Sequence, residues 1–140
     1  MNSVINIPAT SISARQVPDD ARINILPRHF GKHMMVLENS VYDFMHQLCE
    51  RYRGGYWHYF ELSNGGFYMA PNQNTMYLCV DGNGFSGEMS ADAAGITVCL
   101  FAYSHLSFRY TDEIFARHYH RLRDFAMDHT EAGLIAAAID

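Results

Sequence analysis

Histidine is the first residue type in this chain that could carry chemistry. Two pairs lie close in sequence, His29 with His33 and His118 with His120. Side chains two apart point to different faces of a helix, so the second pair is a poor metal clamp. Pro27 interrupts a regular helix around the first pair, and the sequence holds no C-x-x-C or H-E-x-x-H motif. The histidines therefore predict ordinary hydrogen bonding, with a metal site assembled from distant residues as the alternative.

A glycine-rich turn offers a second kind of site. The segment GNGFSG, residues 82–87, matches the G-x-G-x-x-G pattern of dinucleotide-binding loops. That pattern must open a helix and be followed by an acidic residue about 20 positions later. Residues 85–89 instead have the composition of a strand, and no acid stands at the expected offset. The segment favours a hairpin, with a nucleotide site as the alternative.

Cysteine and serine are the candidate nucleophiles. Cys49 falls in a helical run, while Cys79 and Cys99 lie in apolar runs, which predicts small buried side chains rather than reactive thiols. The sequence has no G-x-S-x-G elbow. We therefore expect no metal, and these residues give no clear sign of a catalytic or cofactor site. The alternative of a different class is a small enzyme or a nucleotide- or metal-binding domain that uses the glycine-rich turns and the histidines.

The elements that must position these residues begin with a helix. Val41, Met45 and Leu48 recur at helical spacing, which predicts a helix over residues 38–53. Four short segments then alternate β-prone residues with glycine- and asparagine-rich turns, which is typical of an antiparallel meander. The predicted strands cover residues 56–62, 67–70, 75–80 and 85–89.

The last third of the chain is predicted to be helical. Ser90, Thr111 and Thr130 can each cap a helix. The predicted fold is α+β, a four-stranded antiparallel sheet packed with about four helices in a single domain over residues 19–140. Residues 1–18 are expected to form a flexible arm or one short strand.

One stretch is unusually rich in aromatic residues and glycine, RGGYWHYFELSNGGFYMAP at residues 53–71. In a strand, Trp57, Tyr59 and Glu61 share a face. Such a face could stack nucleic-acid bases, but residues 54–90 contain no lysine or arginine. The stretch therefore favours a sheet covered on both faces or an aromatic protein-contact surface.

Charge and composition narrow the functional classes. The 140 residues are 49% hydrophobic and carry a net charge of −5, too little for a protein that imitates DNA. Arg117 and Arg121 share one helix face among acidic residues, which predicts a solvated face, with a small protein-contact patch as the alternative. There is no long apolar run and no secretory signal. Three widely spaced cysteines indicate reduced thiols and a cytoplasmic location.

Four blocks of the sequence resemble the ArdB/KlcA antirestriction family in order over residues 20–140. They are LPRHFG (26–31), YRGGYWHYFELSNGGFYMAP (52–71), GNGFSGEMSADAAGI (82–96) and YHRLRDFAMDHTEAGLIAAAID (119–140). The second and third blocks are long and unusual in composition, which makes the resemblance specific.

The resemblance implies a protein of plasmids or other mobile elements that relieves type I restriction-modification of incoming plasmid or phage DNA. It implies no catalysis and no cofactor. We expect contact with the restriction machinery, directly or through another host protein, and no direct binding of nucleic acid or membrane. The candidate partner contacts are positions in the family blocks that we expect to be exposed: Trp57, Tyr59, Glu61, Arg121, Arg123 and Asp140.

Overall fold

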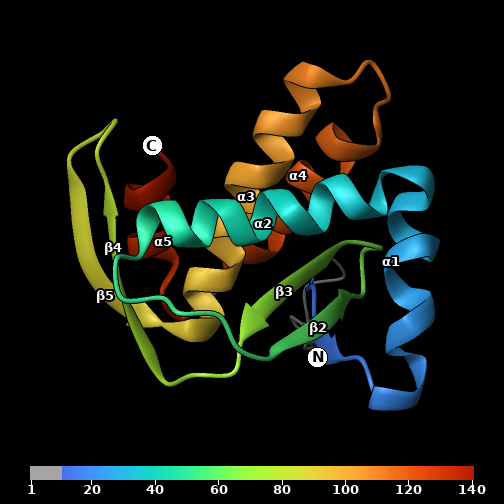
Figure 1. The fold of residues 1–140 in the computed structure, drawn as a ribbon, viewed down its shortest axis with the longest axis horizontal. Coiled ribbons are helices and arrows are strands. Elements are labelled where there is room, and N and C mark those ends of the chain that lie inside the picture. The colour runs from blue at the N-terminus through green and yellow to red at the C-terminus, as the bar shows by residue number, and fades with distance from the viewer. Residues whose placement is uncertain (1–10) are drawn as a thin grey trace, which may run out of the picture.

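The structure is a computed structural model that describes residues 11–140 (Figure 1). Its helices and strands follow one another along the chain in this order: β1 (Ala14–Gln16), η1 (Asp19–Ala21), α1 (Arg22–Phe30), η2 (Gly31–His33), α2 (Met34–Leu48), β2 (Trp57–Leu62), β3 (Phe67–Pro71), β4 (Thr75–Val80), β5 (Phe85–Ser90), α3 (Ala91–Arg109), α4 (Ile114–Ala126) and α5 (Ala132–Ile139). The predicted α+β class is confirmed. None of the helices within residues 11–140 combines the length and the apolar character needed to cross a membrane.

The strands form two sheets, so the predicted four-stranded meander is wrong. One antiparallel sheet has the order β1-β2-β3, and β4 pairs only with β5 in the other. The backbone carbonyls of alternate residues in β3 point away from β2. Side chains of α3 donate hydrogen bonds to two of these carbonyls. The Tyr103 hydroxyl donates to the carbonyl of Phe67 at 2.5 Å, and the Cys99 thiol to that of Met69 at 3.7 Å. Since α3 occupies this edge, β4 does not pair with β3.

Helix α3 lies at the centre of the fold and touches both sheets (Figure 1). The prediction that this segment is buried on nearly all sides is confirmed. The predicted cap is confirmed as well, because the Ser90 hydroxyl accepts from the Ala93 amide at 3.0 Å. At the start of α4, by contrast, the side chain that accepts a backbone amide is that of Asp112 and not of Thr111.

The first half of the chain holds two differences from expectation. Helix α1 runs through Pro27, which was expected to interrupt a helix. Pro27 is solvent-exposed, and it removes only one backbone N–H donor from the helix, so the helix tolerates it. Helix α2 spans residues 34–48 instead of 38–53. Of the predicted arm, residues 1–10 lie outside the described residues and Ala14–Gln16 form β1, which is the strand alternative.

Candidate functional site

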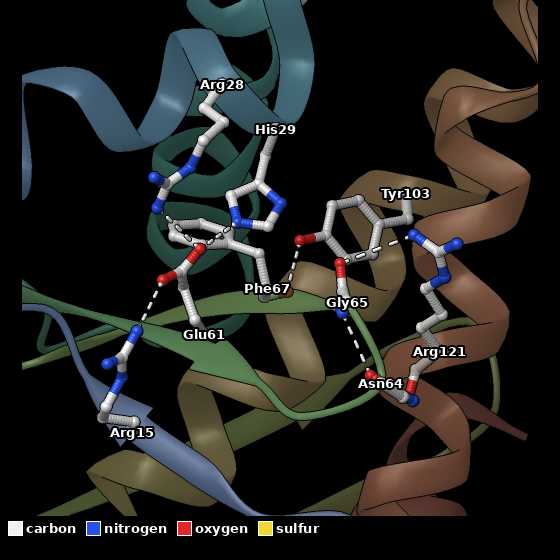
Figure 2. A network of polar contacts seen from close by, with 10 residues as sticks. Arg15, Arg28, His29, Glu61, Asn64, Gly65, Phe67, Tyr103 and Arg121 are labelled. Atoms are coloured by element: carbon white, nitrogen blue, oxygen red, sulfur yellow. Dashed lines mark hydrogen bonds and ion pairs between the residues drawn. The ribbon is translucent and has the colours of Figure 1, made fainter.

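A carboxylate surrounded by cationic side chains marks the most distinctive polar cluster of the structure (Figure 2). Glu61, near the end of β2, accepts from Arg15 Nη2 at 3.2 Å through Oε1. Its other oxygen, Oε2, lies 3.0 Å from Arg28 Nη2 and 2.8 Å from His29 Nε2. The partners come from β1 and α1, so this one side chain ties a strand and a helix to the centre of the sheet.

Electrostatics keep Glu61 ionised. Partial burial would raise the pKa of its carboxyl, but the hydrogen bonds from His29 and Arg28, together with the charge of Arg28, outweigh burial and hold that pKa below its usual value. The Glu61 side chain is 18% exposed, whereas those of Arg15 and Arg28 are 78% and 63% exposed. The carboxylate therefore anchors two guanidinium groups that remain open to solvent.

Aromatic rings pack against His29 on the core side of the cluster. The His29 ring packs at 5.3 Å from both Phe67 and His118, measured between ring centroids. His118 is buried, and burial lowers its pKa to about 3, helped by the nearby charges of Arg121 and Arg117. Its imidazole is thus neutral at physiological pH and acts as one more ring in the core.

The turn between β2 and β3 forms the opposite side of the cluster (Figure 2). The Asn64 side chain donates to the carbonyl of Arg121 at 3.0 Å, which fastens the turn to α4. Gly65 adopts φ +89°, and a Cβ there would lie 3.3 Å from Arg121 Nη1, so both the backbone and the neighbouring guanidinium favour glycine. Glu61, His29, Arg15 and this turn line a hollow of about 280 Å³.

Two predicted contact residues are not where the sequence led us to expect them. Trp57 is 2% exposed and Tyr59 is 7% exposed, so the expectation that they lie on the surface is wrong. Trp57 Nε1 donates to the hydroxyl of Tyr52 at 2.8 Å. The Tyr59 ring lies under the guanidinium of Arg22 at 4.1 Å, and its hydroxyl donates to Glu38 at 3.2 Å. Helices α1 and α2 cover the sheet face that was expected to meet a partner.

The other predicted contact residues fall into two places. Glu61 and Arg121 lie on the two sides of the β2–β3 turn (Figure 2). Arg123 and Asp140 instead line a hollow of about 380 Å³ between α4 and α5. Arg121 and Arg123 are separated because positions two apart on a helix point to different sides. Their roles as contacts stay predictions.

The alternative functions rest on the glycine-rich turn, the histidines and the cysteines. Residues 82–87 form the turn of the β4–β5 hairpin and the first half of β5, not the start of a helix, so they lack the geometry of a dinucleotide loop. Within residues 11–140 no three His, Cys, Asp or Glu side chains gather as a metal site. Cys79 is exposed, against expectation, because strand alternation places it on the solvent side of β4. Cys49 and Cys99 are buried, as predicted.

The arrangement that most resembles a catalytic acid–base pair is that of His129 and Asp92, but its histidine has no free ring nitrogen to act as a base. His129 Nε2 lies 2.8 Å from Asp92, whose other oxygen accepts from the Tyr68 hydroxyl at 2.7 Å. His129 Nδ1 accepts from the amide of Glu131 at 3.0 Å, so both ring nitrogens are engaged within the protein. The arrangement joins the start of α5 to the start of α3.

Sequence reasoning missed Arg15, Arg28 and His29 as members of one cluster with Glu61. These residues lie 46, 33 and 32 positions from Glu61 along the chain. Local spacing carries no signal for contacts at such separations. The only available clue was the place of Arg28 and His29 inside the block LPRHFG.

Comparison with known proteins identifies the family. The family model described as "Antirestriction protein" matches residues 50–140. The antirestriction protein KlcA of Escherichia coli is 45% identical over 97% of this chain and 100% of its own length. The uncharacterized protein YafX of E. coli K12 is 42% identical over 96% of this chain and 92% of its own.

A comparison with solved structures points to the same family. A structure reported for the KlcA and ArdB proteins matches with a TM-score of 0.85 and 46% identity over 100% of both chains. Those proteins are described as having a novel fold and antirestriction activity against type I DNA restriction systems in vivo but not in vitro. This chain therefore belongs to the antirestriction protein family that includes KlcA, as its four sequence blocks predicted.

Proposed function

We propose that this protein relieves type I restriction of incoming DNA inside the cell, and that it does so by contact with another protein. The observation that carries the proposal is the match to KlcA along the whole of both chains, in sequence and in fold. Sequence identity and a fold that agree over that length support the same activity.

The charge distribution supports protein contact over imitation of DNA. A DNA mimic must present a dense array of carboxylates, because a duplex carries one negative charge per about 1.7 Å. The surface at the β2–β3 turn presents the opposite sign, since Arg15 and Arg28 contact the single carboxylate of Glu61 and Arg121 lies against Gly65 on the other side of the turn. Such a surface suits an acidic protein partner and not the DNA-binding channel of a restriction enzyme.

Two routes fit this function, direct contact with the restriction enzyme and contact with another host protein. The description of KlcA and ArdB as active in vivo but not in vitro favours the second route. An intermediary present in the cell and absent from a purified reaction explains that difference.

Transfer of unmodified DNA tests the proposal. Cells with a type I restriction system are infected with unmodified phage, with and without expression of this chain. We expect the plating efficiency to rise at least tenfold on expression, and no change would overturn the proposed function. Adding the purified protein to a purified type I enzyme, with and without cell extract, then separates the routes. Inhibition without extract supports direct contact, and inhibition only with extract supports the intermediary.

A further inference from the structure

We propose that the arginine surface at the β2–β3 turn, formed by Arg15 and Arg28 beside Glu61 and by Arg121 on the other side of the turn, binds a segment rich in aspartate or glutamate on the partner protein. The inference rests on the proposed function and assigns it a place and a chemistry. It also gives a role to Arg121, which was predicted as a contact from the sequence, and adds two residues that were not.

The first argument is the supply of unused hydrogen-bond donors. A guanidinium group carries five N–H donors. Arg15 and Arg28 each give one contact to Glu61, and within the described part of the chain neither guanidinium has another acceptor in reach. Both side chains are mostly exposed, at 78% and 63%. Their remaining donors face solvent and are available to carboxylates, whose planar geometry matches the guanidinium fork.

The second argument is preorganisation. Long arginine side chains on a free surface lose conformational entropy when they bind. Glu61 restrains Arg15 and Arg28 before any partner arrives, and the packing of Glu61 against His29 holds the carboxylate itself in place. Arg121 is placed by the turn, where its guanidinium lies against Gly65. The surface therefore resembles a built recognition site more than a set of independent surface charges.

The third argument concerns charge excess. Two guanidinium groups contact one carboxylate, a third lies across the turn from it, and Arg117 lies one helical turn before Arg121 on α4. This local excess of positive charge occurs in a chain whose net charge is −5. Since the basic residues gather at one turn while acids prevail elsewhere, an acidic partner segment would be attracted to this turn and repelled by much of the remaining surface.

An acidic protein segment explains the surface better than nucleic acid does. Tight binding to a duplex draws on many phosphate contacts along an extended basic stripe. Here the hollow of about 280 Å³ is lined by Arg15 together with the ionised carboxylate of Glu61. That carboxylate repels a phosphate backbone laid across it, whereas separate side-chain carboxylates can reach the arginines around it.

Matched neutral variants test the inference. Arg15→Gln/Arg28→Gln removes two positive charges and keeps an amide donor beside Glu61. The control, Arg51→Gln/Arg109→Gln, removes two exposed charges away from this cluster. In restricting cells we expect the first variant to lose at least tenfold of the antirestriction effect and the control to keep it. Equal activity of both variants, beside an active wild type, would overturn this inference and leave the proposed function intact.

A binding measurement provides a readout that does not depend on antirestriction. Fluorescence anisotropy is recorded with a labelled ten-residue peptide of alternating glutamate and glycine, and with a labelled 20-base-pair duplex. We expect the peptide to bind, to lose at least fivefold in affinity with Arg15→Gln/Arg28→Gln, and to bind the control like wild type. Binding of the duplex that disappears in the same variant, or no difference between the variants, would overturn the inference.

Folding is controlled in the same samples. The melting temperatures of both double variants should lie within a few degrees of wild type, because ion pairs with exposed arginines contribute little to stability. If the double variant does not fold, the single change Arg28→Gln replaces it in both assays. A wild type that fails to relieve restriction overturns the proposed function, while the peptide measurement still decides whether the surface binds carboxylates.

Discussion

Each of the two hairpins of this protein has an asparagine that shapes its turn, but the surroundings of the two turns differ. In the β2–β3 turn, Asn64 Oδ1 accepts from the amide of Gly66 at 3.0 Å and Nδ2 donates to a carbonyl of α4 at 3.0 Å. In the β4–β5 turn, Asn83 Oδ1 accepts from the amide of Phe85 at 2.9 Å and Nδ2 donates to the carbonyl of Ala138 in α5 at 2.8 Å. Each asparagine thus shapes its own turn and fastens it to a helix near the end of the chain.

The strands beyond these turns differ in burial. Every residue of β3 is buried, with Phe67 packed toward His29 on one face and Tyr68 stacked on Phe60 at 4.7 Å on the other. In β4 alternate residues are exposed, among them Tyr77 and Cys79. Aromatic richness in the first hairpin therefore marks double-sided packing, and the proposed partner contact lies instead with the charged residues near its turn.

The closest packing in the first hairpin lies between α3 and the edge of β3. A Cβ on Gly95 would lie 2.4 Å from the Met69 carbonyl oxygen and 2.6 Å from the Cα of Ala70, so backbone would have to move. We expect Gly95→Ala to lower the free energy of unfolding by about 3 kcal/mol, because strain at a packed backbone is not relieved by side-chain rotation. Urea unfolding followed by circular dichroism measures this loss.

Gly133 is the matched control for Gly95. It lies in α5, and a Cβ there would meet nothing within 4 Å. Gly133→Ala should stabilise the protein by up to about 1 kcal/mol, because alanine is the better helix former. Equal stability of the two variants would show that the contact between α3 and β3 is not tight.

We expect the loss of stability at acid pH to come from His118, which lies beside the first hairpin. Among the Asp, Glu, His, Lys and Arg side chains of residues 11–140, His118 is the only buried one, and it faces His29, Arg117 and Arg121. Burial lowers its pKa to about 3, whereas an unfolded histidine titrates near 6.5. Between these values the unfolded state binds a proton that the folded state excludes. The contribution of His118 to stability is complete above pH 6.5 and falls toward pH 3, by at most about 1.4 kcal/mol per pH unit.

Replacement of His118 tests whether this residue causes the loss of stability at acid pH. His118→Phe keeps a ring beside Phe30, whose centroid lies 4.6 Å away, and removes the titrating group. The slope of unfolding free energy against pH between 5 and 6.5 should become flatter than in wild type. His120→Phe, at an exposed position of the same helix, is the control and should keep the wild-type slope. An unchanged slope in His118→Phe would assign the acid sensitivity to other groups.

Local patterns predicted the second hairpin better than they predicted the arrangement of the sheets. The limits of β4 follow from its own alternation, and the Ser90 cap follows from one residue at a helix start. The split into two sheets depends on Tyr103 and Cys99 reaching the outer carbonyls of β3 from α3. Those contacts span 30 residues or more along the chain, beyond what periodicity can indicate.

The candidate site shows the same limit. Glu61 and Arg121 could be selected from the sequence because both lie in unusual blocks that identify the family. Trp57 and Tyr59 were assigned to the surface because alternation defines two faces of a strand without saying which helices cover each. The turn chemistry at Asn64 and Asn83 was visible in the sequence, but the helices that they bind were not.

A pair of tyrosines compares the two hairpins directly. Tyr103 is fully buried, and its hydroxyl donates to the Phe67 carbonyl at the edge of the first hairpin. Tyr77 is 53% exposed on the second hairpin. We expect Tyr103→Phe to cost about 2 kcal/mol, because it leaves a buried carbonyl without a donor. Tyr77→Phe should change stability by less than about 0.5 kcal/mol. Similar values from urea unfolding of the two variants would contradict the difference in burial.

The smallest expected effect is the difference in stability between the same change, Asn→Asp, made at Asn64 and at Asn83. Asn→Asp keeps the oxygen that shapes the turn and removes the amide donor that binds the helix. At Asn83 the new carboxylate would face the last carbonyls of α5, where the helix dipole is negative, so we expect a loss of about 1 kcal/mol. At Asn64 the new carboxylate would face the carbonyl of Arg121 within α4 instead of the free carbonyls at a helix end, so we expect a smaller loss of less than about 0.5 kcal/mol. Thermal unfolding at low salt should therefore place Asn83→Asp below Asn64→Asp, and the opposite order would show that the donor bond matters more than the charge around it.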